Sequence, residues 1–184
     1  MRVIAGTARH LPLKAPAGRH TRPTGDKIKE TLFNILHYDM PGARFLDLFA
    51  GSGAIGIEAL SRGAEFAAFV DNDGAAIRCV EENLDFTGFT ERSLVLKKDY
   101  VSAFTTLKKT GVYDVIFADP PYADGVEKTL VDLVDSSGLL AEDGTFIMEA
   151  ALDTDFSFVE DTGLEVVREK TYKTSKHVFM EIKK

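Results

Sequence analysis

The sequence of 184 residues contains few of the features that mark secreted, metal-binding or membrane proteins. Its single cysteine, Cys79, cannot form an internal disulfide, and the absence of Cys and His clusters leaves no zinc motif. No apolar run approaches the length that spans a bilayer, and residues 1–10 lack the apolar core of a signal peptide. We therefore expect a cytoplasmic protein with no membrane or metal partner, and we take a monomer as the expected state.

Acidic residues are absent from one end of the chain. The first 25 residues contain five Lys and Arg side chains, whereas all 29 Asp and Glu residues follow them. The net charge of −7 thus combines a basic arm with an acidic body. Such asymmetry can mark a surface that binds a polyanion, although a solvated extension would have the same composition. Arg9 and Arg22 are the candidate contacts to a phosphate backbone, because a guanidinium can bind a phosphate with two hydrogen bonds.

From residue 45 onward, apolar strand patterns alternate with helical patterns. Strands are expected at residues 45–50, 66–70, 93–97, 112–118, 144–149, 164–172 and 177–183. Helices are expected at residues 54–62, 73–86 and 124–135, after a first helix that follows Thr24 as its N-cap. The early strands are apolar on both faces, which is typical of a parallel sheet covered by helices on both sides.

The last two strands differ from the others, because only the short turn "KTSK" separates them. A crossover helix cannot fit into that length, so the final strand should return antiparallel. Before the first helix, "MRVIAG" and "LPLKAP" suggest a small hairpin. We expect a basic arm at residues 1–23 and a single α/β domain at residues 24–184.

The segment "GSGAIG", residues 51–56, lies between the first predicted strand of the domain and a helix. Its glycines allow a tight turn and close approach of a ligand, and the helix N-terminus offers N–H groups. Asp71 ends the next strand, 20 residues after Gly51, where a carboxylate can accept both hydroxyls of a ribose. The pattern predicts a site for a cofactor that contains a nucleoside.

Two cofactors fit that description. NAD matches the glycines and the acid, but the sequence has no recognisable motif for hydride transfer. S-adenosylmethionine also has an amino-acid end, which Asp47 could hold near the first strand. Asp99 could then accept from the adenine amino group, with the N–H of Tyr100 directed to a ring nitrogen, or Asp99 could simply cap a surface helix. We favour S-adenosylmethionine.

The segment "FADPPY" ends the predicted strand at residues 112–118 with a rigid corner, because two prolines cannot continue a strand. The exocyclic amino group of a base is a poor nucleophile. The Asp119 carboxylate and the Pro120 carbonyl could bind its two hydrogens, while Pro121 fixes the geometry and Tyr122 offers a ring for stacking. The alternative is a Pro-Pro turn with a buried tyrosine.

"DLFAGSGAIGIEAL" together with "FADPPY" resembles the class I S-adenosylmethionine-dependent methyltransferases that act on amino groups. "TRPTGDKIKETLFNIL", residues 21–36, resembles one branch, the bacterial family D of small-subunit ribosomal RNA guanine-N2 methyltransferases. The resemblance implies a Rossmann-like, seven-stranded and mostly parallel sheet with an antiparallel last strand and an N-terminal β-hairpin. It also implies guanine 966 of 16S ribosomal RNA as the target, with a small-subunit ribosomal particle as partner.

The same resemblance implies roles for individual residues. Those that would line the cofactor are Asp47, Phe49, Gly51, Gly53, Asp71 and Asp99, and those that would hold the base are Asp119, Pro120, Pro121 and Tyr122. The chain departs from the family in its first hairpin, where "TARHLPL" stands in place of a basic "YRGR" type of run. This departure puts the RNA footprint in question.

Other functions share parts of this pattern. A cytosine-C5 methyltransferase needs a thiolate on a loop, and Cys79 lies inside a predicted helix, so that activity is excluded. A DNA adenine-N6 methyltransferase shares the corner but usually has a separate region for target recognition. A protein glutamine methyltransferase usually has Asn as the first residue of the corner. A non-catalytic, cofactor-binding factor for ribosome assembly is the alternative from another functional class.

Overall fold

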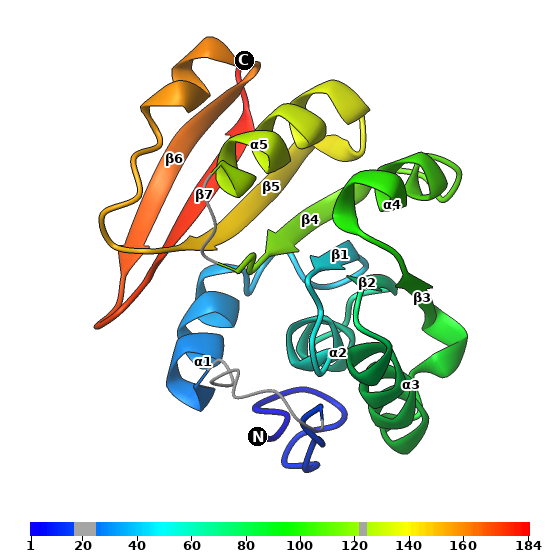
Figure 1. The fold of residues 1–184 in the computed structure, drawn as a ribbon. Coiled ribbons are helices and arrows are strands. Elements are labelled where there is room, and N and C mark those ends of the chain that lie inside the picture. The colour runs from blue at the N-terminus through cyan, green and yellow to red at the C-terminus, as the bar shows by residue number, and fades with distance from the viewer. Residues whose placement is uncertain (17–24, 122–124) are drawn as a thin grey trace. The chain divides into compact units, whose positions relative to one another are not determined.

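The computed structural model describes residues 1–16, 25–121 and 125–184, and it contains both the predicted strands and the predicted helices (Figure 1). The strands are β1 Arg44–Leu48, β2 Phe66–Asp71, β3 Ser93–Lys97, β4 Tyr113–Ala118, β5 Leu140–Ala150, β6 Leu164–Thr171 and β7 Lys176–Ile182. The α-helices are α1 Asp26–Ile35, α2 Ala54–Ser61, α3 Gly74–Thr87, α4 Tyr100–Leu107 and α5 Val126–Ser137. Two short 3₁₀ helices are η1 Thr90–Arg92 and η2 Ser157–Asp161.

The strands form one seven-stranded sheet in the order β3-β2-β1-β4-β5-β7-β6. β2 pairs in parallel with both β1 and β3, and β4 pairs in parallel with β5. β7 runs antiparallel to both β5 and β6. The predicted fold class, a mostly parallel α/β sheet with a reversed last strand, is therefore confirmed.

The chain forms two compact units, Met1–Tyr100 and Val101–Lys184. In the first unit, α2 packs against β1 and β2, and α3 packs against β2 and β3. Gly56 permits the close approach of α2, because a Cβ there would lie 2.3 Å from Cε1 of Phe69. In the second unit, α5 packs against β5 and η2. The division into an arm and a domain at residues 23 and 24 stays a prediction.

Two helix starts differ from the sequence-based expectation. The proposed N-cap Thr24 lies outside the described residues, and α1 begins at Asp26 with Gly25 in the N-cap position. Helix α4 was not predicted at all. Its sequence, YVSAFTTL, is short and holds β-branched residues at several positions, which lowers helix propensity and obscures the helical period.

The N-terminal segment, residues 1–16, forms a reduced hairpin. Arg2 and Pro12 form a single antiparallel bridge, and the N–H of Val3 donates to the carbonyl of Leu11 at 3.0 Å. Val3, Leu13 and Ala8 are buried, with 0%, 7% and 5% of their surface exposed. This part of the basic arm is therefore packed within the first unit.

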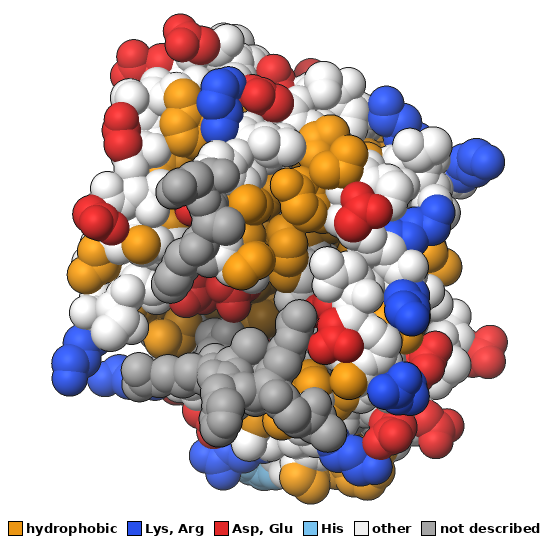
Figure 2. Space-filling model, viewed as in Figure 1, with side chains coloured by type: hydrophobic (Ala, Val, Ile, Leu, Met, Phe, Trp, Pro, Cys, Tyr) orange, Lys and Arg blue, Asp and Glu red, His pale blue; other side chains and the backbone are white. Residues whose placement is uncertain are grey.

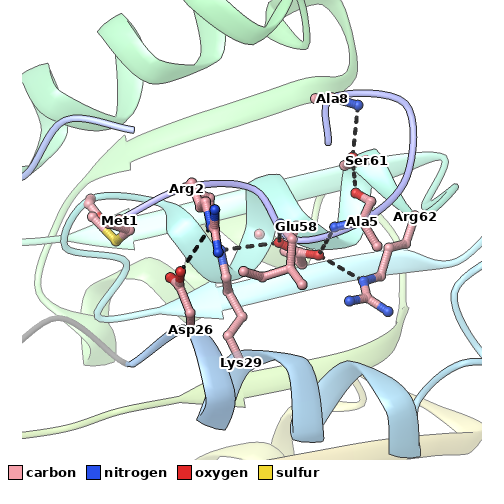
Figure 3. Close-up of polar contacts among 12 residues, drawn as sticks. Met1, Arg2, Ala5, Ala8, Asp26, Lys29, Glu58, Ser61 and Arg62 are labelled. Atoms are coloured by element: carbon pink, nitrogen blue, oxygen red, sulfur yellow. Dashed lines mark hydrogen bonds and ion pairs between the residues drawn. The ribbon is translucent and has the colours of Figure 1, made fainter. Parts of the chain in front are cut away.

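Glu58 of α2 anchors this segment (Figure 3). Its side chain is fully buried, and its two carboxylate oxygens accept from the N–H groups of Ile4 at 2.8 Å and Ala5 at 3.0 Å. Lys29 of α1 and Arg62 form ion pairs with the same carboxylate at 3.1 and 2.8 Å. Burial lowers the pKa of Lys29, and the charge of Glu58 opposes that shift. One buried carboxylate thus joins the N-terminal segment to α1 and α2.

The surface of the described residues carries both signs of charge. On the face that Figure 2 shows, acidic and basic side chains both occur, and neither sign forms a continuous patch among the residues described there. In the described ranges, no helix has the length and apolar character needed to cross a membrane. Nor do those ranges contain three or more His, Cys, Asp or Glu residues grouped to hold a metal ion.

Candidate functional site

The glycine loop, residues 49–53, connects β1 to α2 through an unusual backbone. Phe49, Gly51 and Gly53 all have positive φ angles, of 64°, 57° and 75°. A left-handed conformation is easy for glycine but uncommon for phenylalanine, and such residues cluster at functional sites. A Cβ added to Gly51 would meet no atom closer than the carbonyl oxygen of Phe49, at 3.9 Å. The loop therefore has room for a ligand against its main chain.

Asp71, at the end of β2, holds the glycine loop directly. Its Oδ2 accepts from the N–H of Gly51 at 2.9 Å, and its Oδ1 accepts from the N–H of Asp73 at 2.9 Å. The residue is 6% exposed. Because each carboxylate oxygen can accept more than one hydrogen bond, both can also receive ribose hydroxyls. Asp71 thus has a structural contact that the sequence pattern alone did not predict.

Asp47 of β1 is almost fully buried, with 2% of its surface exposed. Its Oδ2 accepts from the N–H of Gly56, in the first turn of α2, at 3.0 Å. The carboxylate therefore fixes the end of β1 against the helix that follows. Its expected contact with the amino-acid end of a cofactor stays a prediction.

Asp99 and Tyr100 lie where β3 gives way to α4. Tyr100 is the first residue of α4, so the exposed Asp99 occupies the position just before the helix, where a cap would stand. The Tyr100 ring lies 5.3 Å from the Phe49 ring, centroid to centroid. The structure therefore brings Phe49 and Tyr100, two predicted cofactor residues, together. The position of Asp99 is compatible with both an adenine contact and a helix cap.

Asn83 connects the glycine loop to the N-terminal segment, a link that sequence reasoning missed. This buried residue of α3 donates from Nδ2 to the carbonyl of Ser52 at 2.9 Å and to the carbonyl of Lys14 at 3.1 Å. Its Oδ1 accepts from the N–H of Lys14 at 2.9 Å. A polar residue in a helix usually faces solvent, so no sequence signal distinguished it.

The predicted corner lies in the second unit. β4 ends at Ala118, and Asp119, Pro120 and Pro121 follow outside regular structure, which confirms that the strand stops there. Tyr122 lies outside the described residues. Part of the Asp119 side chain is exposed to solvent, but the protein around it partly desolvates the carboxyl group. This desolvation, together with the negative charge of Glu149, raises the pKa of Asp119 to about 7. Asp119 is therefore a carboxyl group that titrates near neutral pH.

Glu149 belongs to a second set of residues that the sequence analysis missed. It lies near the end of β5, and its Oε2 is 3.1 Å from Nε2 of His177, on β7. The Nδ1 of His177 is 3.2 Å from the hydroxyl of Tyr172. Because "HVFMEIK" is an ordinary alternating strand, His177 gave no signal of a buried polar contact.

The candidate RNA contacts differ in what surrounds them. Arg9 is exposed and has no ion-pair partner among the described residues, whereas Arg22 lies outside them. Arg2 pairs with Asp26 at 3.1 Å, and Lys14 pairs with Glu82 at 2.7 Å. Exposed pairs such as these contribute little stability, so a phosphate could compete for either cation. Arg9 is the clearest single probe of an RNA surface.

Replacing Asp71 with alanine is expected to weaken binding of S-adenosylmethionine by about 1–3 kcal/mol, through lost hydrogen bonds to a charged acceptor. The loop contact to Gly51 adds to that loss. Calorimetry measures the effect, with Asp73→Ala as control, because Asp73 caps α3 through the N–H of Ala75 and should change stability more than affinity. Tight binding of NAD and none of S-adenosylmethionine would contradict the assignment of this site.

Three comparisons with known proteins agree with one another. The family model described as "Conserved hypothetical protein 95" matches residues 1–181. The chain is 43% identical to "Putative rRNA methyltransferase YlbH" of Bacillus subtilis over 174 residues, which are 94% of each chain. It is 35% identical to "Ribosomal RNA small subunit methyltransferase D" of Escherichia coli, over 83% of this chain and 76% of that one. The solved structure of "Putative methyltransferase yhhF" from Escherichia coli superposes with a TM-score of 0.85 and 31% identity, covering 99% of this chain and 97% of that one.

Proposed function

Because the chain belongs to the family of ribosomal RNA small subunit methyltransferase D, matched by the model "Conserved hypothetical protein 95", we propose that it methylates the N2 amino group of a guanine in 16S ribosomal RNA. The family resemblance suggests guanine 966, in a small-subunit particle, as the target. The observation that carries the proposal is the combination of a cofactor loop with a carboxyl group, Asp119, on a proline corner.

The cofactor of this reaction is S-adenosylmethionine, which supplies the methyl group, while the electron pair of its S–C bond leaves with the sulfur. The residues of the first unit fit such a ligand. Asp71 offers a carboxylate at the end of β2, and the positive φ angles of Phe49 and Gly51 leave the loop's main chain open to close approach. Asp47 stands at the end of the neighbouring strand, β1.

The corner residues would act on the base. The Asp119 carboxylate and the Pro120 carbonyl can each accept one hydrogen of an amino group, which orients the nitrogen for attack. The nitrogen that forms the new N–C bond must lose one proton, and an ionised Asp119 can accept it. Because the pKa of Asp119 is about 7, that acceptor is available at and above neutral pH. Tyr122 would stack on the base.

The proposed function is tested by the transfer of tritium from labelled S-adenosylmethionine to ribosomal RNA that lacks this modification. Digestion and chromatography would then identify the labelled nucleoside. We expect N2-methylguanosine from 16S ribosomal RNA, on naked RNA or on the assembled small subunit. Label in N6-methyladenosine of DNA would instead support the alternative of an adenine methyltransferase, and binding without any transfer would support a non-catalytic assembly factor.

Losing Arg9 and Arg22 together should weaken RNA binding and flatten its salt dependence by about one unit of slope per phosphate contact. The reason is that each arginine releases counterions when it binds a phosphate. Filter binding across a salt series measures both quantities for the Arg9→Ala, Arg22→Ala double variant. Binding of S-adenosylmethionine should stay nearly unchanged, because the arm is proposed to bind RNA and not the cofactor.

The matched control is Arg78→Ala, since Arg78 lies on α3 of the acidic body and outside the basic arm. An unchanged affinity and slope in the double variant would rule out the arm as the RNA contact. If Arg22→Ala alone also weakened cofactor binding, residues 21–24 would instead cover the amino-acid end of the cofactor.

A further inference from the structure

Polar side chains lie in a row across the carboxyl end of β4 and its neighbours in the second unit. β4 and β5 pair in parallel up to Ala118 and Met148, and the next residues are Asp119, just after β4, and Glu149 of β5. Glu149 in turn pairs with His177 across the antiparallel β5 and β7. Because directly opposed residues of a sheet point to the same face, the side chains of Glu149 and His177 are neighbours, and the charge of Glu149 in turn acts on the Asp119 carboxyl group.

His177 is held in a single orientation within this row. It is fully buried, and both of its ring nitrogens lie within hydrogen-bond distance of a partner, Glu149 at 3.1 Å and Tyr172 at 3.2 Å. The rings of Phe117 and Tyr172 meet it edge to face, with centroids at 5.7 and 4.9 Å. Hydrogen bonds and packing together leave the imidazole no other position.

The hydrogen bond of His177 also determines the charge of Glu149. Burial alone would raise the pKa of Glu149, but the hydrogen bond and charge of His177, with a further hydrogen bond from Ser175, lower it. The side chain is only 12% exposed, so it is a partly buried carboxylate with fixed partners. Because a carboxylate only accepts, the proton of this contact lies on Nε2 of His177.

We propose that Glu149, fixed by His177 and Tyr172, is a positioning residue that sets the charge state of Asp119 and thereby the pH range of methyl transfer. The effect on methyl transfer rests on the proposed function. The effect of Glu149 on the charge of Asp119 does not depend on it. Glu149 does not touch the substrate in this scheme. It acts through Asp119, because a second negative charge nearby disfavours ionisation of the first.

The charges around Asp119 support this direction. Burial and the charge of Glu149 raise the pKa of Asp119 to about 7. Other titratable groups face the row from the neighbouring strands. They are His177 on β7, Lys170 directly opposite it on β6, and Tyr172 just after β6. Lys176 and Glu169 pair with each other at 3.2 Å on the opposite face of the sheet, and Glu149 is the acid that acts on Asp119.

The first test follows the Asp119 carboxyl carbon by NMR during a pH titration of the whole protein. In Glu149→Gln, we expect the Asp119 midpoint to move to lower pH by on the order of 1 unit, because the amide keeps its shape but carries no charge. Glu165→Gln is the matched control. It removes the same charge from β6, about 17 Å along the strand from Lys170, which lies opposite His177, and should not move the midpoint. An unmoved midpoint in Glu149→Gln overturns the inference.

The second test is the pH profile of methyl transfer to RNA under single-turnover conditions. For the wild type, the rate should rise with pH through about 7, because Asp119 must be ionised to accept the proton. In Glu149→Gln, the pH at which the rate rises should move in the same direction and by the same amount as the Asp119 midpoint measured by NMR. A lower plateau with no shift in that pH would indicate a merely structural role and would overturn the inference.

The role of His177 is tested by a double-mutant cycle. His177→Gln should change the Asp119 midpoint in the wild-type background but add no change in the Glu149→Gln background, since it acts through Glu149. An equal change of the Asp119 midpoint in both backgrounds would show that His177 does not act through Glu149. If the wild type transfers no methyl group at all, the proposed function fails, whereas the NMR titration still decides the inference.

Discussion

Replacing Asp119 with alanine is expected to reduce methyl transfer at least about 100-fold while leaving the affinity for S-adenosylmethionine within a few-fold of wild type. The loss has the size seen when a single positioned charge or acceptor is removed from an active site. Asp119 is proposed to bind the amino group and accept its proton, and alanine can do neither. The cofactor residues lie in the first unit, so their contacts should persist.

Single-turnover transfer of tritium to RNA measures the rate, and calorimetry measures cofactor affinity. Asp143→Ala is a suitable control, because it removes an exposed acid of the same unit, on β5, and should leave both quantities unchanged. Asp119→Asn separates the two roles of the side chain. The amide oxygen still accepts a hydrogen bond from the amino group but cannot take up its proton at neutral pH, so an intermediate rate is expected.

Tyr122 completes this prediction. Tyr122→Ala should be severely impaired and Tyr122→Phe much less so, because stacking depends on the ring more than on the hydroxyl. A wild-type rate in Asp119→Ala would show that the amino-group mechanism is wrong. A large loss of cofactor affinity in the same variant would instead show that Asp119 contributes to the cofactor site.

The alternation of strands with helices and the reversed last strand follow from local signals in the sequence. The apolar runs that become β1, β2 and β4 lie in a chain that alternates strands with helices, and such runs are buried only between two helical layers. The short turn between β6 and β7 leaves no room for a crossover. These features depend on periodicity and length, which are properties of neighbouring residues.

The contacts that fix the candidate sites were not predictable in the same way. Asp71 was recognised by its spacing from Gly51, but its bond to that residue depends on where the loop closes. Glu149 and His177 are 28 residues apart and meet only because β7 returns beside β5. Each is an ordinary polar residue in its own strand. Their contact depends on the register between β5 and β7, which the sequence of either strand alone does not reveal.

The burial of two charged residues was also not predictable from the sequence. Nothing in the sequence pattern marked Lys29 of α1 or Glu58 of α2 as buried, yet both are essentially inaccessible to solvent. They are buried because they pair with each other and with the N-terminal segment. A helical pattern identifies the apolar stripe, but it does not reveal a charged pair within it.

Glu58→Ala is expected to lower the free energy of unfolding by about 3–5 kcal/mol, the size typical of removing one partner from a buried ion pair. The variant would leave the buried ammonium of Lys29 without its carboxylate, and the N–H groups of Ile4 and Ala5 without their acceptor. Urea unfolding measures the change. Faster hydrogen exchange at Ile4 and Ala5 should accompany it, because the N-terminal segment loses its anchor.

Two further variants show whether the buried charge is the cause. Glu65→Ala removes an exposed acid just after α2 and should change stability by no more than about 0.5 kcal/mol. Glu58→Leu combined with Lys29→Leu should recover part of the loss seen in Glu58→Ala, because the fully buried ammonium is then removed together with its carboxylate and only Arg62, at 11% exposure, loses an ion-pair partner. A double variant less stable than Glu58→Ala would mean that the hydrogen bonds to the N-terminal segment, and not the ion pair, account for most of the effect.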